Sequence, residues 1–260
     1  MHVSAMKNAR RFFEAYSTQT DRKGSPIVLD VGSQDINGSL RQVAPAEFKY
    51  IGVDFAAGNG VDLVLEDPYK LPFESESIDI VLSSSCFEHA EMFWLSYLEA
   101  LRVLKPTGLL YLNAPSNGAY HRYPVDCWRF YPDAGRALVA WARKNGLRPT
   151  LLESFIGLQD ADIWNDFVAV FLKDDQFAHL YPDRMVNHFE GFENGLLLGS
   201  EEILRYQHHV EDRRRITTGA NAGGAELASS ASRPGWPSQG RLERSLARIG
   251  RKIDRLWAKG

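Results

Sequence analysis

Residues 27–38, IVLDVGSQDING, decide the fold of this protein. The stretch opens with a short and almost wholly apolar run of the strand type, which Gly32 follows directly. Similar runs stand at residues 50–54 (YIGVD), 78–83 (IDIVLS) and 109–113 (LLYLN). Runs that are apolar along their whole length are typical of strands covered on both faces, as in a parallel sheet.

Segments with helical periodicity alternate with these runs. The expected helices lie at residues 3–16, 90–104 and 134–145, with another beginning at 39–43, and two more strands are expected at 150–155 and 167–172. Strand–helix alternation predicts an α/β fold, a doubly wound and mostly parallel sheet with helices on both faces.

The composition of the chain changes after residue 173. We expect five segments: an N-terminal helix and lead-in (1–25), the core (26–173), a polar helical extension (174–215), a flexible linker rich in Gly, Ala, Ser and Pro (216–240), and a basic amphipathic helix (241–260). The last helix is expected to dock on the core or on a second copy, or else to lie on an anionic membrane surface.

The bulk properties exclude several classes. A formal net charge of -3 gives no field that attracts a polyanion, so a nucleic-acid partner is not expected. Two cysteines, Cys86 and Cys127, form neither a disulfide framework nor a zinc motif. We see no signal-peptide core and no apolar run of membrane-spanning length. The expectation is a cytoplasmic protein, peripheral at the inner membrane face if its last helix binds lipid.

Ligand-binding side chains follow three successive strands at their carboxyl ends, where open α/β sheets bind ligands. Gly32 lets the backbone approach a ligand closely. Asp54 ends the second strand, and a carboxylate there can accept both hydrogen bonds of a ribose diol. Asp67 stands just before an apolar Leu-Pro-Phe segment and can accept from an adenine amino group. The pattern predicts a nucleoside-type ligand.

The order of these elements resembles the class I methyltransferase family over residues 27–172. The blocks VLDVGS, YIGVD, LPFESESIDIVLSSSCFEH and LEALRVLKPTGLLYLNAP carry the resemblance. It implies a seven-stranded sheet with an antiparallel last strand, and S-adenosylmethionine as the cofactor across the first strand ends. The cofactor-binding positions that it implies are Asp30, Gly32, Ser33, Gln34, Asp54, Phe55, Asp67, Ser83 and Ser84.

Gln34 departs from the family pattern. The glycine loop of the family usually reads DxGxGxG, and Gln34 stands where its second glycine belongs. We therefore expect the loop to take a different and wider path. A hydride-transferring Rossmann domain is the alternative that also needs a glycine turn and a ribose acid, but the G-x-G-x-x-G pattern is missing.

Residues 113–131 follow a core strand and should lie over the open end of the cofactor site. They combine aromatic rings, which stack on sugar C–H faces, with side chains that hydrogen-bond to hydroxyls or pair with a phosphate. The predicted substrate-binding residues are Tyr120, Arg122, Tyr123, Asp126, Trp128 and Arg129. The structural alternative is that Trp128 belongs to the core and that Arg129 pairs with a surface acid.

Methyl transfer to a hydroxyl needs alignment and benefits from a base that takes the proton. His121, in the segment above, and His89, after the fourth strand, are the candidate catalytic residues, with His121 ranked first. Glu88 and His89 also resemble a metal-binding pair of quinone O-methyltransferases. Ser85 stands where a further acidic ligand would be, so no metal is predicted.

The leading hypothesis is a methyltransferase that modifies a sugar or glycan hydroxyl. Residues 32–41 and 114–135 also resemble methyltransferases of bacterial cell-surface polysaccharide synthesis. Methylation of a quinone or another small molecule is a second hypothesis. A scaffold that binds the cofactor without catalysis is a third, favoured if the Gln34 loop blocks the site.

Overall fold

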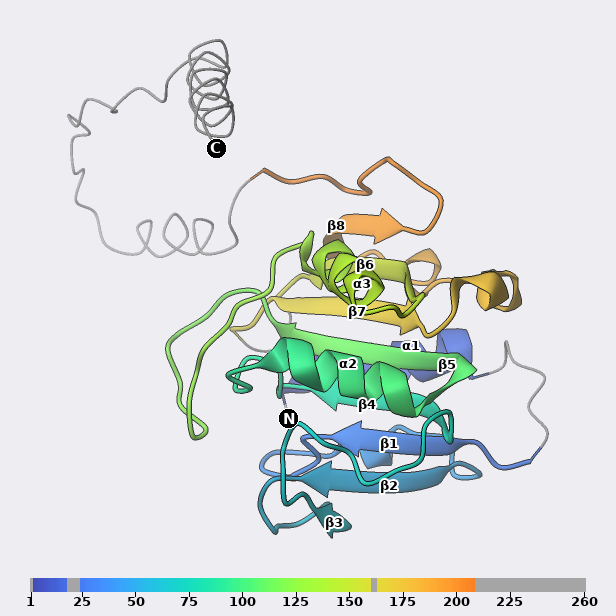
Figure 1. Cartoon of the computed structure of the whole chain (residues 1–260). Coiled ribbons are helices and arrows are strands. Elements are labelled where there is room, and N and C mark those ends of the chain that lie inside the picture. Colours follow the sequence, from blue (N-terminus) through green and yellow to red (C-terminus); the bar gives the residue numbers. More distant parts are fainter. Residues whose placement is uncertain (1, 18–23, 160–162, 209–260) are drawn as a thin grey trace, which may run out of the picture. The chain divides into compact units, whose positions relative to one another are not determined.

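The computed structural model describes residues 2–17, 24–159 and 163–208. Its centre is an eight-stranded sheet in the order β3-β2-β1-β4-β5-β7-β6-β8 (Figure 1). The strands are β1 (Ile27–Val31), β2 (Lys49–Asp54), β3 (Leu63–Val64), β4 (Ile78–Ser84), β5 (Leu104–Pro115), β6 (Thr150–Gly157), β7 (Asp166–Leu172) and β8 (Phe192–Leu197). Six of these strands correspond to the runs predicted from the sequence.

Strands β3, β2, β1, β4 and β5 run parallel to one another. Strand β7 is inserted antiparallel between β5 and β6, so the seventh strand reverses direction as the family resemblance implied. The sheet has eight strands and not the seven expected, because β8, which the sequence did not predict, extends it by pairing antiparallel with β6. Strand order reverses between β1 and β4, and this point is where a doubly wound sheet holds its ligand.

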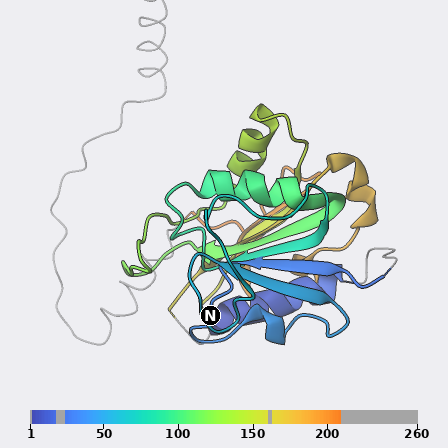
Figure 2. The ribbon, with the colours of Figure 1, turned by 60° about the horizontal axis from the view of Figure 1, so that its bottom comes forward.

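Helices cover both faces of the sheet (Figures 1 and 2). Helices α2 (Phe93–Val103) and α3 (Ala134–Lys144) bury apolar side chains in a cluster with alternate strand residues such as Leu29. Helix α1 (Val3–Tyr16) packs on the opposite face, in a second cluster that contains Val28. Side chains of neighbouring strand residues point to opposite faces, and this explains the continuous apolar runs.

The helix expected to begin at residues 39–43 is a single 3-10 turn, η1 (Leu40–Gln42). Pro45 limits it, because a proline disfavours helical backbone at the residue before it. The chain then turns directly into β2.

The described part of the expected helical extension, residues 174–208, is not an α-helix. It contains the short 3-10 helices η2 (Asp175–Leu180) and η3 (Met185–Asn187), with Pro182 between them, and then strand β8. Its polar composition suggested a solvated helix, but its backbone instead pairs with the edge of β6. The expectations for residues 209–260, including the linker and the basic helix, lie outside the described residues.

No helix within the described ranges is both long and apolar enough to cross a membrane.

A buried carboxylate on β6 connects this strand to α1 and η3 by hydrogen bonds. Glu153 of β6 accepts hydrogen bonds from the Tyr16 hydroxyl (2.6 Å) and from the backbone N–H groups of Met185 (2.7 Å) and Val186 (3.1 Å). Burial raises the pKa of Glu153, and the hydrogen bonds oppose that effect. Helix α1 and η3 are thereby fixed on β6.

We expect Glu153→Ala to lower the free energy of unfolding by about 3–5 kcal/mol, because three buried donors lose their acceptor. Tyr16→Phe removes only one of these bonds and should cost about 1–2 kcal/mol. Urea unfolding followed by circular dichroism measures both values. Equal losses in the two variants would contradict the central position of Glu153.

Candidate active site

The loop after β1 turns sharply beneath the end of β2. Gly32 has a φ of 85°, a left-handed conformation that favours glycine. The N–H groups of Gly32 and Ser33 both donate to the Val53 carbonyl, at 3.0 and 3.1 Å. A Cβ on Gly32 would also lie 2.6 Å from the Cβ of Cys86. Only glycine therefore fits between the ends of β1 and β4.

Asp54 lies buried at the end of β2. One carboxylate oxygen accepts from the N–H of Gln34 (3.1 Å) and the other from the N–H of Ala56 (3.3 Å). A carboxylate has about four acceptor positions, so Asp54 retains capacity for a ribose diol. Phe55 follows with half of its surface exposed, as a ring that could cover a base.

Two further polar atoms at this switch point fit a polar ligand. Oδ1 of Asp30 and Oγ of Ser33 are buried, and neither has a hydrogen-bond partner among the described residues. Oδ2 of Asp30 accepts from the Tyr50 hydroxyl at 2.6 Å. Burial raises the pKa of Asp30 to about 6. Buried polar atoms are rarely left without partners, and these two fit the polar part of an amino-acid or nucleoside ligand.

The remaining predicted cofactor positions differ in exposure. Ser83 and Ser84 are the last residues of β4 and are buried beside the loop after β1. Asp67 is exposed, and its carboxylate accepts the N–H of Tyr69 at 2.8 Å. Ser83 and Ser84 therefore lie buried at a strand end, whereas Asp67 is exposed to solvent.

Gln34 uses its side chain where the family has a glycine. Its amide contacts the backbone of Ala57, at 3.5 Å from the carbonyl, and fills the space above Gly58. Its Oε1 accepts from the Tyr123 hydroxyl at 2.8 Å. The side chain of Gln34 therefore bonds the loop after β1 to Tyr123, far along the chain.

Residues 116–131, here named the acceptor loop, close over the carboxyl ends of the strands. The Glu88 carbonyl accepts from the N–H groups of Cys127 (2.8 Å) and Trp128 (3.2 Å). Asn117 and Asn165 exchange two further hydrogen bonds, at 2.7 and 2.9 Å. Bonds to two different strand ends fix the path of the loop.

Gly118 allows the acceptor loop to lie flat on the ring of Trp164. It has a φ of 104°, and a Cβ there would overlap the ring. Trp164 in turn contacts His121, with ring centroids 4.9 Å apart, and Arg129, whose guanidinium lies 6.0 Å from the ring centre. The loop therefore packs on the start of β7.

Asp126 organises the inside of the acceptor loop. It accepts the backbone N–H of His121 at 2.6 Å and forms two hydrogen bonds with Arg129, at 2.5 and 2.8 Å. Burial would raise the pKa of Asp126, but these bonds dominate and hold it at about 2. Asp126 and Arg129 were predicted to bind substrate, and in the structure they bond to each other and to other residues of the acceptor loop.

The other predicted substrate-binding residues divide into two groups. Trp128 donates to the Ala90 carbonyl at 3.0 Å and packs against Phe93, which is the structural alternative for this residue. Tyr120, Arg122 and Tyr123 are exposed on the outer part of the loop. All three expose surface to solvent, although the Tyr123 hydroxyl donates to Gln34 and Nε of Arg122 donates to the Pro124 carbonyl (3.1 Å).

The two candidate bases lie side by side, His121 in the acceptor loop and His89 after β4. The rings of His89 and His121 are 5.0 Å apart, and Glu88 lies buried beside them, with Oε1 at 3.7 Å from Nε2 of His89. Burial raises the pKa of Glu88 to about 8 and lowers that of His89 below its ordinary value. The ligand atoms of Glu88, His89 and His121 lie within 4.8 Å of one another.

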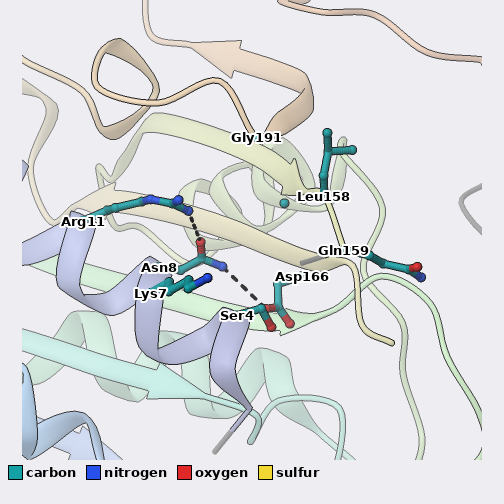
Figure 3. A pocket seen from close by; sticks show the side chains of 9 residues that line it. Ser4, Lys7, Asn8, Arg11, Leu158, Gln159, Asp166 and Gly191 are labelled. Carbon is teal, nitrogen blue, oxygen red and sulfur yellow. Dashed lines mark hydrogen bonds between the residues drawn. The ribbon is translucent and has the colours of Figure 1, made fainter. Parts of the chain in front are cut away.

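A cavity of about 240 Å³ lies between α1 and the ends of β6 and β7 (Figure 3). It is lined by Ser4, Lys7, Asn8, Arg11, Gly157, Leu158, Gln159, Asp166 and Gly191. Asn8 donates to Asn113 at the end of β5 (3.1 Å) and to Asp166 (3.5 Å). This cavity was not predicted from the sequence, where its signal is the pair of cations Lys7 and Arg11, four residues apart on α1.

Residues 29–112 match the sequence model of the family described as a methyltransferase domain. This part of the chain is similar to the methyltransferase domains of that family. The family takes its methyl group from S-adenosylmethionine. The glycine turn at Gly32, the acid at Asp54 and the unpartnered atoms of Asp30 and Ser33 fit such a ligand.

Curated relatives of the methyltransferase domain are uncharacterized methyltransferases of mycobacteria. One from Mycobacterium leprae is 34% identical over 141 residues, covering 47% of this chain and 49% of its own length. One from Mycobacterium tuberculosis is 34% identical over 107 residues, covering 39% of this chain and 40% of its own length. The chain thus spans half or less of the length of these relatives.

The fold is similar to that of a Burkholderia thailandensis 1,6-didemethyltoxoflavin-N1-methyltransferase solved with S-adenosylhomocysteine. The likeness has a TM-score of 0.50 at 15% identity and covers 66% of this chain and 79% of that one. It supports the methyltransferase fold.

We expect Gly118→Ala to release the acceptor loop of the methyltransferase domain, because the new methyl group overlaps Trp164. Trypsin should then cut at Arg122 about ten-fold faster or more, since displacing a packed ring costs at least ~1.4 kcal/mol. Gly146→Ala is the matched control, with a φ of 80° and no atom within 4 Å of the added Cβ. Equal rates in the two variants would show that Trp164 does not hold the loop.

Proposed function

We propose that this protein is an S-adenosylmethionine-dependent O-methyltransferase that acts on a hydroxyl of a sugar or glycan. The observation that carries the proposal is the pair of imidazoles, His89 and His121, held side by side at the ligand-binding edge of the sheet. When bound, S-adenosylmethionine supplies an electrophilic methyl group on its sulfonium. The residues of the chain must align the acceptor and remove its proton.

The acceptor side of the site favours a polyhydroxylated compound with an anionic group. Tyr120, Arg122 and Tyr123 present rings and a guanidinium on the exposed part of the acceptor loop. Lys7 and Arg11 line the neighbouring cavity, where they outnumber the single acid, Asp166. Aromatic faces suit sugar rings, and paired cations suit a phosphate or carboxylate, as in a nucleotide sugar or an acidic glycan. Bacterial polysaccharide synthesis uses acceptors of this chemistry.

His121 is the proposed base. Its side chain is 36% exposed, against 13% for His89, so an acceptor hydroxyl reaches it more readily. Its Nδ1 lies 3.2 Å from the Ala119 carbonyl and 3.4 Å from Oδ2 of Asp126, two acceptors that outweigh the more distant donor Arg129 (3.5 Å) and favour the tautomer in which Nε2 keeps the lone pair. Asp126 fixes the backbone of His121 and the orientation of the ring. As the C–O bond forms, Nε2 takes the hydroxyl proton.

His89 is the second candidate for the base. Its Nδ1 donates to the Val125 carbonyl at 2.5 Å, which leaves Nε2 unprotonated in the neutral ring. Burial lowers its pKa, so the ring is neutral and able to accept a proton at pH 7.

The proposal is tested by a transfer assay with methyl-labelled S-adenosylmethionine and a panel of neutral glycans, acidic glycans, nucleotide sugars and quinols. Product masses and fragmentation identify the methylated oxygen. We expect label on a sugar hydroxyl. Label on a quinol alone would overturn the acceptor class, and cofactor binding without transfer to any acceptor would favour a scaffold.

We expect Asp54→Ala to weaken binding of S-adenosylmethionine by about 2–4 kcal/mol, because charge-assisted hydrogen bonds to the ribose are lost. Titration calorimetry measures the change, with S-adenosylhomocysteine as a second ligand. Glu190→Ala removes an exposed acid elsewhere and serves as the control. Unchanged affinity in the Asp54 variant would remove the ribose assignment.

We expect His121→Ala to lower kcat about a hundred-fold or more while affinity for S-adenosylmethionine stays constant, as for the loss of a general base. His179→Ala, an exposed histidine on η2, should behave as the wild type. If His89→Ala is inactive and His121→Ala is normal, His89 is the base. If both retain full activity, neither imidazole takes the proton.

A further inference from the structure

Glu88, His89 and His121 bring two imidazoles and a carboxylate to one point, although the sequence separates His121 from the other two by more than thirty residues. The sequence pattern suggested only two metal ligands, with Ser85 in the place of a third. The acceptor loop supplies the missing ligand, because its bonds to the Glu88 carbonyl fold His121 back over His89.

We propose that Glu88, His89 and His121 bind a divalent transition-metal ion of the zinc type, and that this ion inhibits the enzyme by occupying its base. Two nitrogens and one carboxylate oxygen suit Zn²⁺, Co²⁺ or Ni²⁺, whereas Mg²⁺ and Ca²⁺ prefer oxygen ligands alone. An imidazole that coordinates an ion has no lone pair left for a proton. The inhibition rests on the proposed function, but the binding does not.

The orientation of both imidazoles favours coordination. Nδ1 of His89 donates to the Val125 carbonyl at 2.5 Å, and Nδ1 of His121 faces the Ala119 carbonyl at 3.2 Å. A histidine that ligates a metal usually donates its other N–H to such an oxygen, which fixes the ring and directs the free nitrogen at the ion. The ring of His89 is therefore set for binding through Nε2, and that of His121 is set likewise in the tautomer that donates from Nδ1 to the Ala119 carbonyl.

Glu88 supplies a carboxylate oxygen, Oε2, that has no hydrogen-bond partner among the described residues. This oxygen is buried, and Oε1 of the same carboxylate lies 3.7 Å from Nε2 of His89. Among the described residues, Asp126 and Asp166 add negative charge around it, and the guanidinium of Arg129 opposes them. A cation at this point would satisfy the buried oxygen and balance the excess of acids.

The spacing needs a contraction. The ligand atoms lie within 4.8 Å of one another, whereas ligands at about 2.1 Å from a tetrahedral Zn²⁺ are ~3.4 Å apart, so they must approach by up to ~1.4 Å. His121 can provide the shift, because it lies in a partly exposed loop while Glu88 and His89 follow β4. Metal binding should therefore draw the acceptor loop inward.

The site is tested on the full chain, freed of metal by a chelator, by titration with Co²⁺ and Zn²⁺. We expect one ion per chain, a Co²⁺ d–d absorption band, and competition by Zn²⁺. His121→Ala should weaken binding more than about ten-fold, since even changes in the residues that support metal ligands cost 10- to 100-fold. His121 is the principal variant because it lies on a loop, whereas Glu88→Gln alters the buried core.

His188→Ala is the matched control, because His188 also pairs with a carboxylate, that of Asp183, but on the exposed surface. It should bind metal as the wild type does. A wild-type chain that takes up no ion, or a His121→Ala variant that binds as well as the wild type, would overturn the site.

Activity assays then test separately whether the bound ion inhibits methyl transfer. We expect Zn²⁺ to reduce methyl transfer at least ten-fold, a chelator to restore it, and calorimetry to show unchanged affinity for S-adenosylmethionine. Activation by the ion would overturn the inhibition and the role of His121 as base while leaving the site in place. Metal binding by a chain that transfers no methyl group to any acceptor would refute the proposed function alone.

Discussion

The main-chain carbonyl of Glu88 is the point on which the active site depends. It accepts the N–H groups of Cys127 and Trp128, and these bonds attach the acceptor loop to the end of β4. The side chain of the same residue faces the two histidines that the loop brings together. Glu88 therefore has two roles: its backbone carbonyl holds the acceptor loop, and its side chain lies beside the histidines. Because the anchor is backbone, a substitution at Glu88 can change the chemistry and keep the loop attached.

The core of the fold could be predicted because the sheet is buried on both faces. Residues such as Val28 and Leu29 point to opposite sides, and each must be apolar, so the strand runs stand out in the sequence. Helix α1 was predicted with its observed bounds for the related reason that one apolar stripe packs on the sheet. Strands β3 and β8 were not predicted from the sequence. β3 is two exposed residues, and β8 derives its structure from the edge of β6.

The positions of Gly32 and Asp54 at strand ends could also be predicted from the sequence, because the fold itself fixes them there. The acceptor side was less predictable. Asp126 and Arg129 looked like ligand-binding groups, but their pairing with each other depends on a loop path that only the tertiary contacts set. The proximity of His89 and His121 depends on the same path, as does the environment that raises the pKa of Glu88.

The hydrogen bond between Gln34 and Tyr123 joins the loop after β1 to the acceptor loop. Any ligand that breaks or strengthens this bond from one side changes the affinity on the other side by the same factor, since linkage is reciprocal. A neutral hydrogen bond contributes about 0.5–1.5 kcal/mol, and a factor of ten in affinity corresponds to ~1.4 kcal/mol. A ligand on one side of this bond and a ligand on the other are therefore coupled through it by at most about one order of magnitude. Through this bond, binding of one ligand changes the affinity for the other but is not required for its binding.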